Sequence, residues 1–231
     1  MFLDKSQNIK KTIYFSFLAQ VVTTFIASQG LTINLDERDS ILKDILKMEL
    51  FVQIIETTFY VWVILALKNY NILTRRRYID WVITTPTMLV STIIFMRYIE
   101  YKEKNKEIPD FWKIIDEEKG AILQIIIYNF FMLAFGYLGE SQLIDKTLSI
   151  GIGFIFFCLS FNKLYEYAKE TETGMNLYKF LVSVWSLYGV SAMLNNTTKN
   201  ICYNLLDIVS KNFYGLYIYY IMSTLELKDG K

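Results

Sequence analysis

Long apolar blocks joined by short polar connections limit how this chain can fold more than any other feature of the sequence. The hydrocarbon core of a bilayer is about 30 Å thick, so a helix that spans it needs roughly 20 predominantly apolar residues. Because lipid offers the backbone no hydrogen-bond partners, a span must satisfy its own backbone, as a helix does. Seven blocks meet this requirement, at residues 12–29, 45–67, 77–98, 120–139, 144–163, 177–196 and 200–222.

The blocks predict an all-α membrane protein, a seven-transmembrane-helix bundle that occupies residues 1–231 as a single domain. The largest connection, residues 101–119, is polar and short, and no linker divides the chain. The lipid bilayer is therefore the first expected partner. The aromatic run YGLYIYY (214–220) is expected to face lipid and the membrane interface.

Composition excludes several classes of function. The net charge is +1, and the sequence lacks the basic patch or stripe that marks a nucleic-acid binder, so no nucleic-acid partner is expected. The chain has no histidine, which removes imidazole catalysis and most zinc sites. We therefore expect neither an enzyme nor a metal centre.

The charges of the connections predict the orientation in the membrane. An odd number of spans places the termini on opposite sides, and the connections after the first, third and fifth blocks hold more Lys and Arg than the others. The positive-inside rule then puts the N-terminus outside and the C-terminus in the cytoplasm, although RRR (75–77) lies on the outer side. The start MFLDKSQNIKK (1–11) lacks a signal-peptide pattern, so we expect the first block to be retained.

The last block carries charges in its middle. Asn200, Asn204, Asp207 and Lys211 follow one another at offsets that place all four on one helical face. An ionisable residue this deep costs roughly 2.5–3.5 kcal/mol on insertion scales and usually faces the bundle interior. In one interpretation Asp207 and Lys211 form a structural ion pair. In the other, Lys211 carries a carbonyl ligand as a Schiff base.

The third block, RRRYIDWVITTPTMLVS (75–91), supplies a possible partner for that lysine. Asp80, Thr84 and Ser91 are separated by 4 and 7 residues, and 11 residues make almost three helical turns, so they line one stripe. Arg77 lies three residues before Asp80. A second buried carboxylate can balance a cation on Lys211, which favours the Schiff-base interpretation.

At these two blocks the sequence resembles microbial (type 1) rhodopsins. The patterns R-Y-x-D-W-x-x-T-T-P in the third block and D-x-x-x-K in the seventh are the signature of that family. The stretch VWSLYG (184–189) is similar to the family's W-S-x-Y-P retinal-pocket stretch, with Gly189 in place of proline. The resemblance covers essentially the whole chain. The D-T-S set of the third block looks most like the rhodopsins of marine giant viruses.

The resemblance implies a retinal-binding domain in which all-trans retinal is covalently bound to Lys211 as a protonated Schiff base. Asp80 would be the primary counterion and proton acceptor, Asp207 the second counterion, and Arg77 the cation that balances these carboxylates. Thr84 would hydrogen-bond Asp80. Members of the family are often oligomeric, so a homo-oligomer is expected. The residues expected to bind retinal or to support its pocket are Trp81, Thr85, Trp185, Tyr188, Tyr60 and Asn129.

The sequence departs from the pump pattern at Ser91, where familiar proton pumps carry a carboxylate as internal proton donor. Glu49 and Glu56 lie seven residues apart on one face of the second block, and glutamates at these places recur in channelrhodopsins. In one interpretation they line a hydrated path with polar residues of the first and seventh blocks. In the other, Glu49 is interfacial and the amides only join helices by hydrogen bonds. The polar residues concerned are Ser16, Gln20, Asn200 and Asn204.

Three functions of a retinal protein remain open. An outward light-driven proton pump is favoured by the complete set Asp80, Thr84, Asp207 and Arg77. Glu49, or water passing Ser91, would return the proton. A light-gated channel for protons or monovalent cations is favoured by the two glutamates of the second block. A photosensory receptor is least favoured, because the tail TLELKDGK (224–231) is short and no transducer contact is evident.

Overall fold

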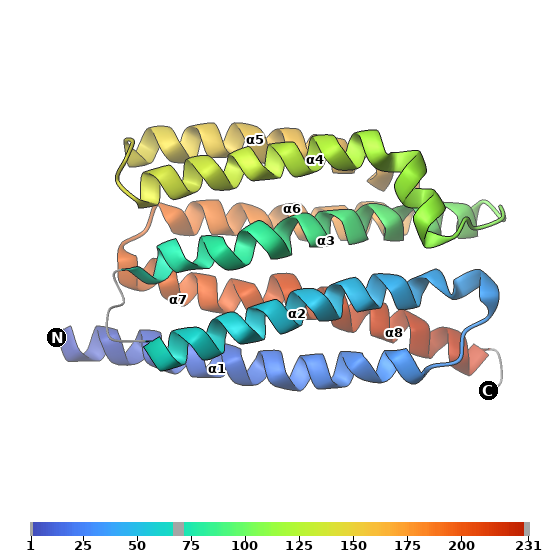
Figure 1. The fold of residues 1–231 in the computed structure, drawn as a ribbon, viewed down its shortest axis with the longest axis horizontal. Helices are drawn as coiled ribbons and strands as arrows, with labels where there is room; N and C mark the ends of the chain where they lie inside the picture. Colours follow the sequence, from blue (N-terminus) through green and yellow to red (C-terminus); the bar gives the residue numbers. More distant parts are fainter. Residues whose placement is uncertain (1, 67–71, 229–231) are drawn as a thin grey trace.

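The computed structural model describes residues 2–66 and 72–228, with side chains described over 7–66 and 72–226. Its helices run side by side along one long axis, and α1 begins at the opposite end of the bundle from the end of α8 (Figure 1). This placement is the one expected for an odd number of spans. The main helices are α1 (Phe2–Ser28), α2 (Ile41–Ala66), α3 (Leu73–Glu103), α4 (Phe111–Glu140), α5 (Lys146–Ala168), α6 (Glu172–Ala192), α7 (Asn196–Asp207) and α8 (Phe213–Lys228).

The seventh predicted span is one rod built from three segments. A π-helical turn, η4 (Ile208–Asn212), joins α7 to α8 without a loop, and Lys211 lies within it. Such turns are rare and occur frequently at functional sites. The seven predicted spans thus match seven helical rods. Residue 67, the end of the second predicted block, lies outside the described residues.

Local sequence explains where several helices begin. A Ser, Thr, Asp or Asn at the N-cap accepts a hydrogen bond from a free backbone N–H of the first turn. The Asp110 side chain accepts from the Lys113 backbone N at 3.0 Å, and Asn195 accepts from the Thr198 N at 3.1 Å. The N-caps of this kind are Asp110, Asp145, Thr171 and Asn195, at the starts of α4, α5, α6 and α7.

Four helical stretches are by themselves long and apolar enough to cross a membrane: Glu37–Ala66, Leu73–Glu103, Phe111–Glu140 and Lys146–Ala168. The remaining rods, α1, α6 and α7–α8, do not reach this measure within the described residues. In α7 the reason is visible, because its buried face is polar, with Asn200, Asn204 and Asp207. The polar face is turned into the bundle, where lipid does not meet it.

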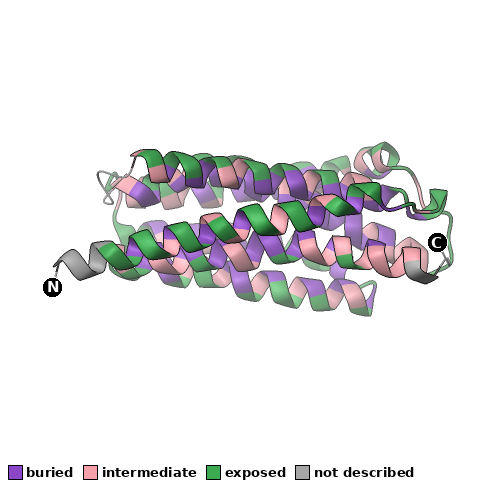
Figure 2. Cartoon of the chain, turned by 90° about the horizontal axis from the view of Figure 1, so that it is seen from below, coloured by how far each residue is buried: buried purple, intermediate pink, exposed green. Residues whose placement is uncertain are grey.

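Burial separates a central helix from peripheral ones. In its most apolar stretch α3 is 67% buried, whereas α4 is only 22% buried. Figure 2 shows the exposed residues as stripes along the outside of the rods and the buried ones turned inward. The expectation that residues 214–220 face lipid is wrong for Tyr214 and Ile218, which are buried because α8 packs against α1 and α2.

Candidate functional site

The Lys211 amine lies among three carboxyl groups in the middle of the bundle. Its Nζ is 2.6 Å from Asp80 Oδ2, 3.1 Å from Glu56 Oε1 and 4.0 Å from Asp207 Oδ1. All four side chains are at least 97% buried. This free amine occupies the place of the Schiff-base nitrogen that a carbonyl ligand would form. The sequence-predicted residues Lys211, Asp80 and Asp207 are therefore brought together, and Glu56 joins them from α2.

Asp207 is held by donors from three other helices. Arg77 Nη1 donates to its Oδ2 at 2.6 Å, the Tyr60 hydroxyl donates to the same oxygen at 2.8 Å, and the Tyr188 hydroxyl donates to Oδ1 at 2.9 Å. Arg77 also donates to the side-chain carbonyl of Asn204. Buried ion pairs are stable only when their remaining polar atoms are hydrogen-bonded, and Asp207 fulfils this condition.

Charge balance at the centre also involves Glu56, a predicted site residue that was not expected to act as a counterion. Two cations, Arg77 and Lys211, face three carboxyl groups, those of Asp80, Asp207 and Glu56. A water-poor interior strongly disfavours net charge. The cluster is neutral when one of the carboxyl groups carries a proton.

Thr84 hydrogen-bonds Asp80, at the backbone of that residue. Its hydroxyl donates to the Asp80 carbonyl at 3.0 Å and not to the carboxylate. Threonine hydroxyls in helices commonly bond the carbonyl one turn earlier, which explains the orientation. Asp80 Oδ1 is left without a hydrogen-bond partner among the described residues.

On the α8 side of Lys211, Glu49 and Ser91 meet. The Ser91 hydroxyl donates to Glu49 Oε1 in a short hydrogen bond, and both residues are fully buried. Glu49 is thus not interfacial: it lies inside the bundle, with its Oε2 free of partners within the described chain. Position 91 itself carries a hydroxyl, and the carboxyl group that meets it there belongs to α2.

A file of buried polar side chains follows the same side of the bundle. Glu49, Gln53, Glu56 and Tyr60 repeat at helical spacing on α2, and all are buried. Both amide atoms of Gln20, Gln53 and Asn212 lack hydrogen-bond partners among the described residues. Buried polar groups without protein partners are usually satisfied by ordered water. Sequence reasoning missed Gln53 and Asn212, although the i, i+3, i+4 spacing of Gln53 to the glutamates of α2 was a usable signal.

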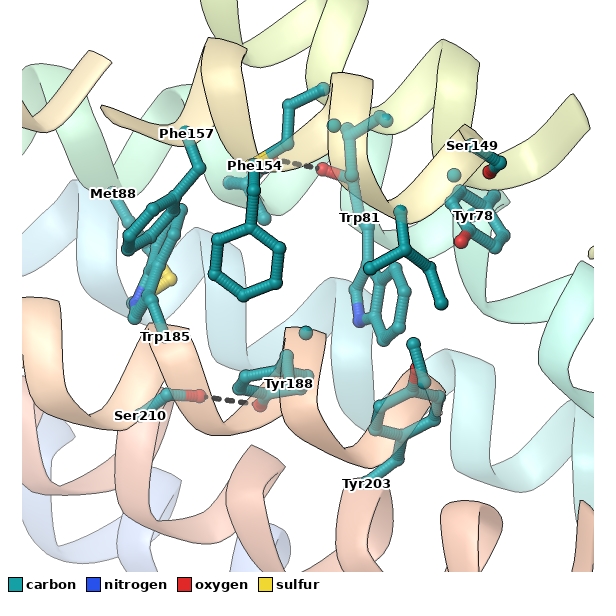
Figure 3. A pocket seen from close by; sticks show the side chains of 18 of the residues that line it. Tyr78, Trp81, Met88, Ser149, Phe154, Phe157, Trp185, Tyr188, Tyr203 and Ser210 are labelled. Atoms are coloured by element: carbon teal, nitrogen blue, oxygen red, sulfur yellow. Dashed lines mark hydrogen bonds between the residues drawn. The ribbon is translucent and has the colours of Figure 1, made fainter. Parts of the chain in front are cut away.

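A cavity of about 130 Å³ lies on the other side of Lys211. Figure 3 shows its aromatic walls, with Trp185 and Phe157 near one end and Trp81, Tyr78 and Tyr203 near the other. A chromophore pocket needs an apolar cavity that reaches the lysine, and this cavity has a mainly apolar lining that includes Lys211. The residues present therefore fit retinal. The lining includes Trp81, Thr85, Met88, Met132, Leu133, Gly136, Phe154, Phe157, Trp185, Tyr188, Gly189, Ser210 and Lys211.

Five of the predicted retinal-binding residues line this cavity: Trp81, Thr85, Trp185, Tyr188 and Lys211. Two do not line it. Tyr60 lies on the polar side, at Asp207, and Asn129 lies behind the wall, where its Nδ2 donates to Thr85 Oγ1 at 2.8 Å. The residues of α4 and α5 in the wall were not predicted, because an apolar residue in a span can equally face lipid.

Comparison with known proteins agrees with this architecture. The sequence model of the bacteriorhodopsin-like protein family matches residues 11–225, and the chain belongs to this family. The chain is similar to the crystal structure of viral rhodopsin OLPVRII, with 29% identity and a TM-score of 0.81, over 94% of this chain and 98% of that one. No curated protein sequence matches.

Two more distant structures share the fold. One is a light-driven proton pump from Leptosphaeria maculans, at 13% identity and a TM-score of 0.69, over 94% of this chain and 97% of that one. The other is halorhodopsin, a light-driven chloride pump, at 15% identity and a TM-score of 0.67, over 95% of each chain. The fold is thus shared by pumps for different ions, so the fold alone assigns no ion and no activity to this chain. The chain is an integral, multi-pass membrane protein of the rhodopsin family.

Proposed function

We propose that the protein binds all-trans retinal on Lys211 and uses light to pump protons outward, from the cytoplasm to the side where α1 begins. The observation that carries the proposal is the 2.6 Å contact between Lys211 Nζ and Asp80 Oδ2. A chloride pump needs no carboxylate at this place, since the anion itself would balance the cation. When bound, retinal supplies light absorption and an isomerisation that changes the direction of the N–H at Lys211.

Asp80 is the proton acceptor in this proposal. Its Oδ2 already accepts a hydrogen bond from Lys211 Nζ, so a proton passes along an existing contact. Asp207 is less suited to accept, because its two oxygens already receive hydrogen bonds from Arg77, Tyr60 and Tyr188. Asp207 keeps the cation stable, and Asp80 takes the proton.

Glu49 returns the proton from the cytoplasmic side. It is buried and hydrogen-bonded to Ser91, and on α2 it is followed at helical spacing by Gln53 and Glu56, the second of which lies 3.1 Å from Lys211. A serine cannot give up a proton at neutral pH, whereas a buried carboxylic acid can serve as a general acid. Ser91 orients Glu49 by their hydrogen bond.

A light-gated cation channel is the second candidate, and a separate observation favours it. Gln20 of α1, Gln53 of α2 and Asn212 of the seventh rod leave their buried amide atoms unpartnered among the described residues, which suits a hydrated path between these three rods. Water in such a path would let cations pass when the gate opens. The same groups serve a pump only if the path stays closed to ions.

Photocurrent measured against membrane voltage separates the two. In cells supplied with all-trans retinal, a pump gives outward current at every voltage, independent of sodium and potassium. A current whose reversal potential follows the sodium or potassium gradient would overturn the pump and support the channel. Absence of light-induced current together with a visible pigment would leave neither form of transport.

A further inference from the structure

Because Gly189 of α6 has no side chain, the aromatic ring of Phe154 from α5 can pack directly against its backbone. A Cβ atom placed on Gly189 would overlap the Cε2 and Cζ atoms of Phe154 and would lie 3.5 Å from its Cδ2. Real Cβ contacts are never this close, so any other residue at 189 requires the ring to move. Proline, which the family's motif carries here, also has a Cβ and would displace the ring in the same way.

The Phe154 ring that packs against Gly189 also lines the chromophore cavity. Phe154 and Gly189 both line the cavity that reaches Lys211. Figure 3 shows the Phe154 ring projecting between Trp185 on one side and Trp81 on the other. The cavity is therefore bounded on its α5–α6 side by a ring whose position depends on the absence of a side chain at 189.

Neighbouring rings limit where Phe154 can go. Phe157 packs against it edge-to-face, with ring centroids 5.8 Å apart, and Phe157 in turn packs on Phe161 at 4.4 Å. Phe161 contacts Trp185, with centroids 5.5 Å apart. This row of rings is close-packed, and a close-packed interior transmits a displacement instead of absorbing it. A ring displaced from Gly189 is therefore blocked on its Phe157 side, and the cavity that it lines changes shape with it.

We infer that the Gly189–Phe154 pair determines which chromophores the pocket accepts, by setting the room available around the ring end of retinal. Lys211 lies on the seventh rod, whereas Phe154 belongs to α5, so a chain tethered at the lysine meets Phe154 away from its attachment point. The inference rests on the proposed binding of retinal and specifies the selectivity of that site. Phe154 is a specificity-determining residue, and Gly189 positions it.

The test compares how fast membranes containing the full-length protein form pigment with all-trans retinal and with an analogue that carries a naphthyl ring. Phe154→Leu opens the wall, and we expect the ratio of naphthyl to retinal incorporation rates to rise about tenfold, as one or two methylene groups of extra room allow. An unchanged ratio overturns the inference, because a residue that only stabilises the fold would alter both rates together.

A second variant tests whether the missing side chain at Gly189 positions Phe154. Gly189→Ala should slow incorporation of both aldehydes, and Gly189→Ala combined with Phe154→Leu should recover most of the lost rate, since contacting residues are not additive. Failure of the double variant to recover overturns the role of Gly189. Gly151→Ala on α5 is the matched control, because a Cβ there meets nothing within 4 Å. If the unaltered protein forms no pigment with retinal, the proposed function itself fails, and this inference fails with it.

Discussion

The two sides of the bundle have opposite interiors, one polar and one aromatic. Between α1, α2 and the seventh rod, fully buried polar side chains such as Gln20, Glu49 and Glu56 fill the interior. Between α4, α5 and α6 the interior is aromatic, with Phe157, Phe161 and Trp185 around a cavity. One side is lined by charged and amide groups, and the other by apolar rings. They meet at Lys211, where we propose that retinal is attached.

The helix between the two sides serves both of them. Arg77 and Asp80 of α3 contact the charged centre, whereas Trp81, Thr85 and Met88 line the cavity. Residues on opposite faces of one helix can do this because successive positions are turned by about 100°. The large buried fraction of α3 follows from this double role.

The variant with the largest expected effect removes Lys211, the residue at which the two sides meet. Lys211→Ala deletes the only amine that touches both the carboxyl groups and the cavity among the described residues, so visible absorbance should disappear entirely after addition of retinal. Lys199→Met is a suitable control, since that buried lysine pairs with Glu140 at 2.6 Å, away from the centre. Visible colour in Lys211→Ala would refute the attachment site.

The variant with the next largest expected effect changes the polar side alone. Asp80→Asn removes the carboxylate nearest to Lys211 Nζ, so the absorption maximum should shift to the red and net proton transfer should stop. Absorption spectra and light-induced pH changes in cell suspensions measure the two effects. If the spectrum stays unchanged, Asp80 does not lie next to the chromophore's charge.

A smaller effect is expected further along the polar file. Glu49→Gln keeps the shape but cannot donate a proton, so reprotonation of the Lys211 site should slow by roughly 10²-fold, the usual contribution of a general acid. Flash photolysis records this step. Asp44→Asn, an exposed carboxylate on the same helix, is the control and should behave like the unaltered protein. A normal photocycle in Glu49→Gln would exclude Glu49 as donor.

The smallest effect is expected behind the aromatic wall. Asn129→Leu removes the hydrogen bond to Thr85 and also an amide oxygen that has no partner among the described residues. The net loss of stability should be about 1 kcal/mol, as for a typical buried hydrogen bond. Thermal bleaching in the dark measures it. A strong loss of pigment would mean that Asn129 contributes directly to the pocket.

The charged centre could be anticipated from residue spacing, whereas the aromatic wall was anticipated only at the positions that the family motifs name, such as Trp81, Trp185 and Tyr188. A charge inside an apolar block is rare and usually faces the interior of the bundle. This is why Asp80, Asp207 and Lys211 could be identified from their spacing alone. An aromatic residue in a span has two equally good locations, lipid or interior. Phe154 and Tyr214 therefore gave no signal, and Tyr214 was expected to face lipid. The direction of the Thr84 hydroxyl was also out of reach, because it depends on a rotamer.

Beyond Asn212 the seventh rod changes character. Beyond the buried Tyr214 its buried face is apolar: Ile218 and Met222 belong to the same core cluster as Leu42, Ile45 and Leu46 at the start of α2, and all five are fully buried. This apolar layer opposes the movement of charge, whereas the polar file on its other side offers groups that can stabilise a moving charge. Most of the membrane voltage should therefore fall across these few side chains. Moving one charge through the full membrane potential changes its free energy by about 2.3 kcal/mol per 100 mV. We expect the voltage dependence of transport to reside in the step that brings a proton across this layer to Glu49, and not in the transfer from Lys211 to Asp80.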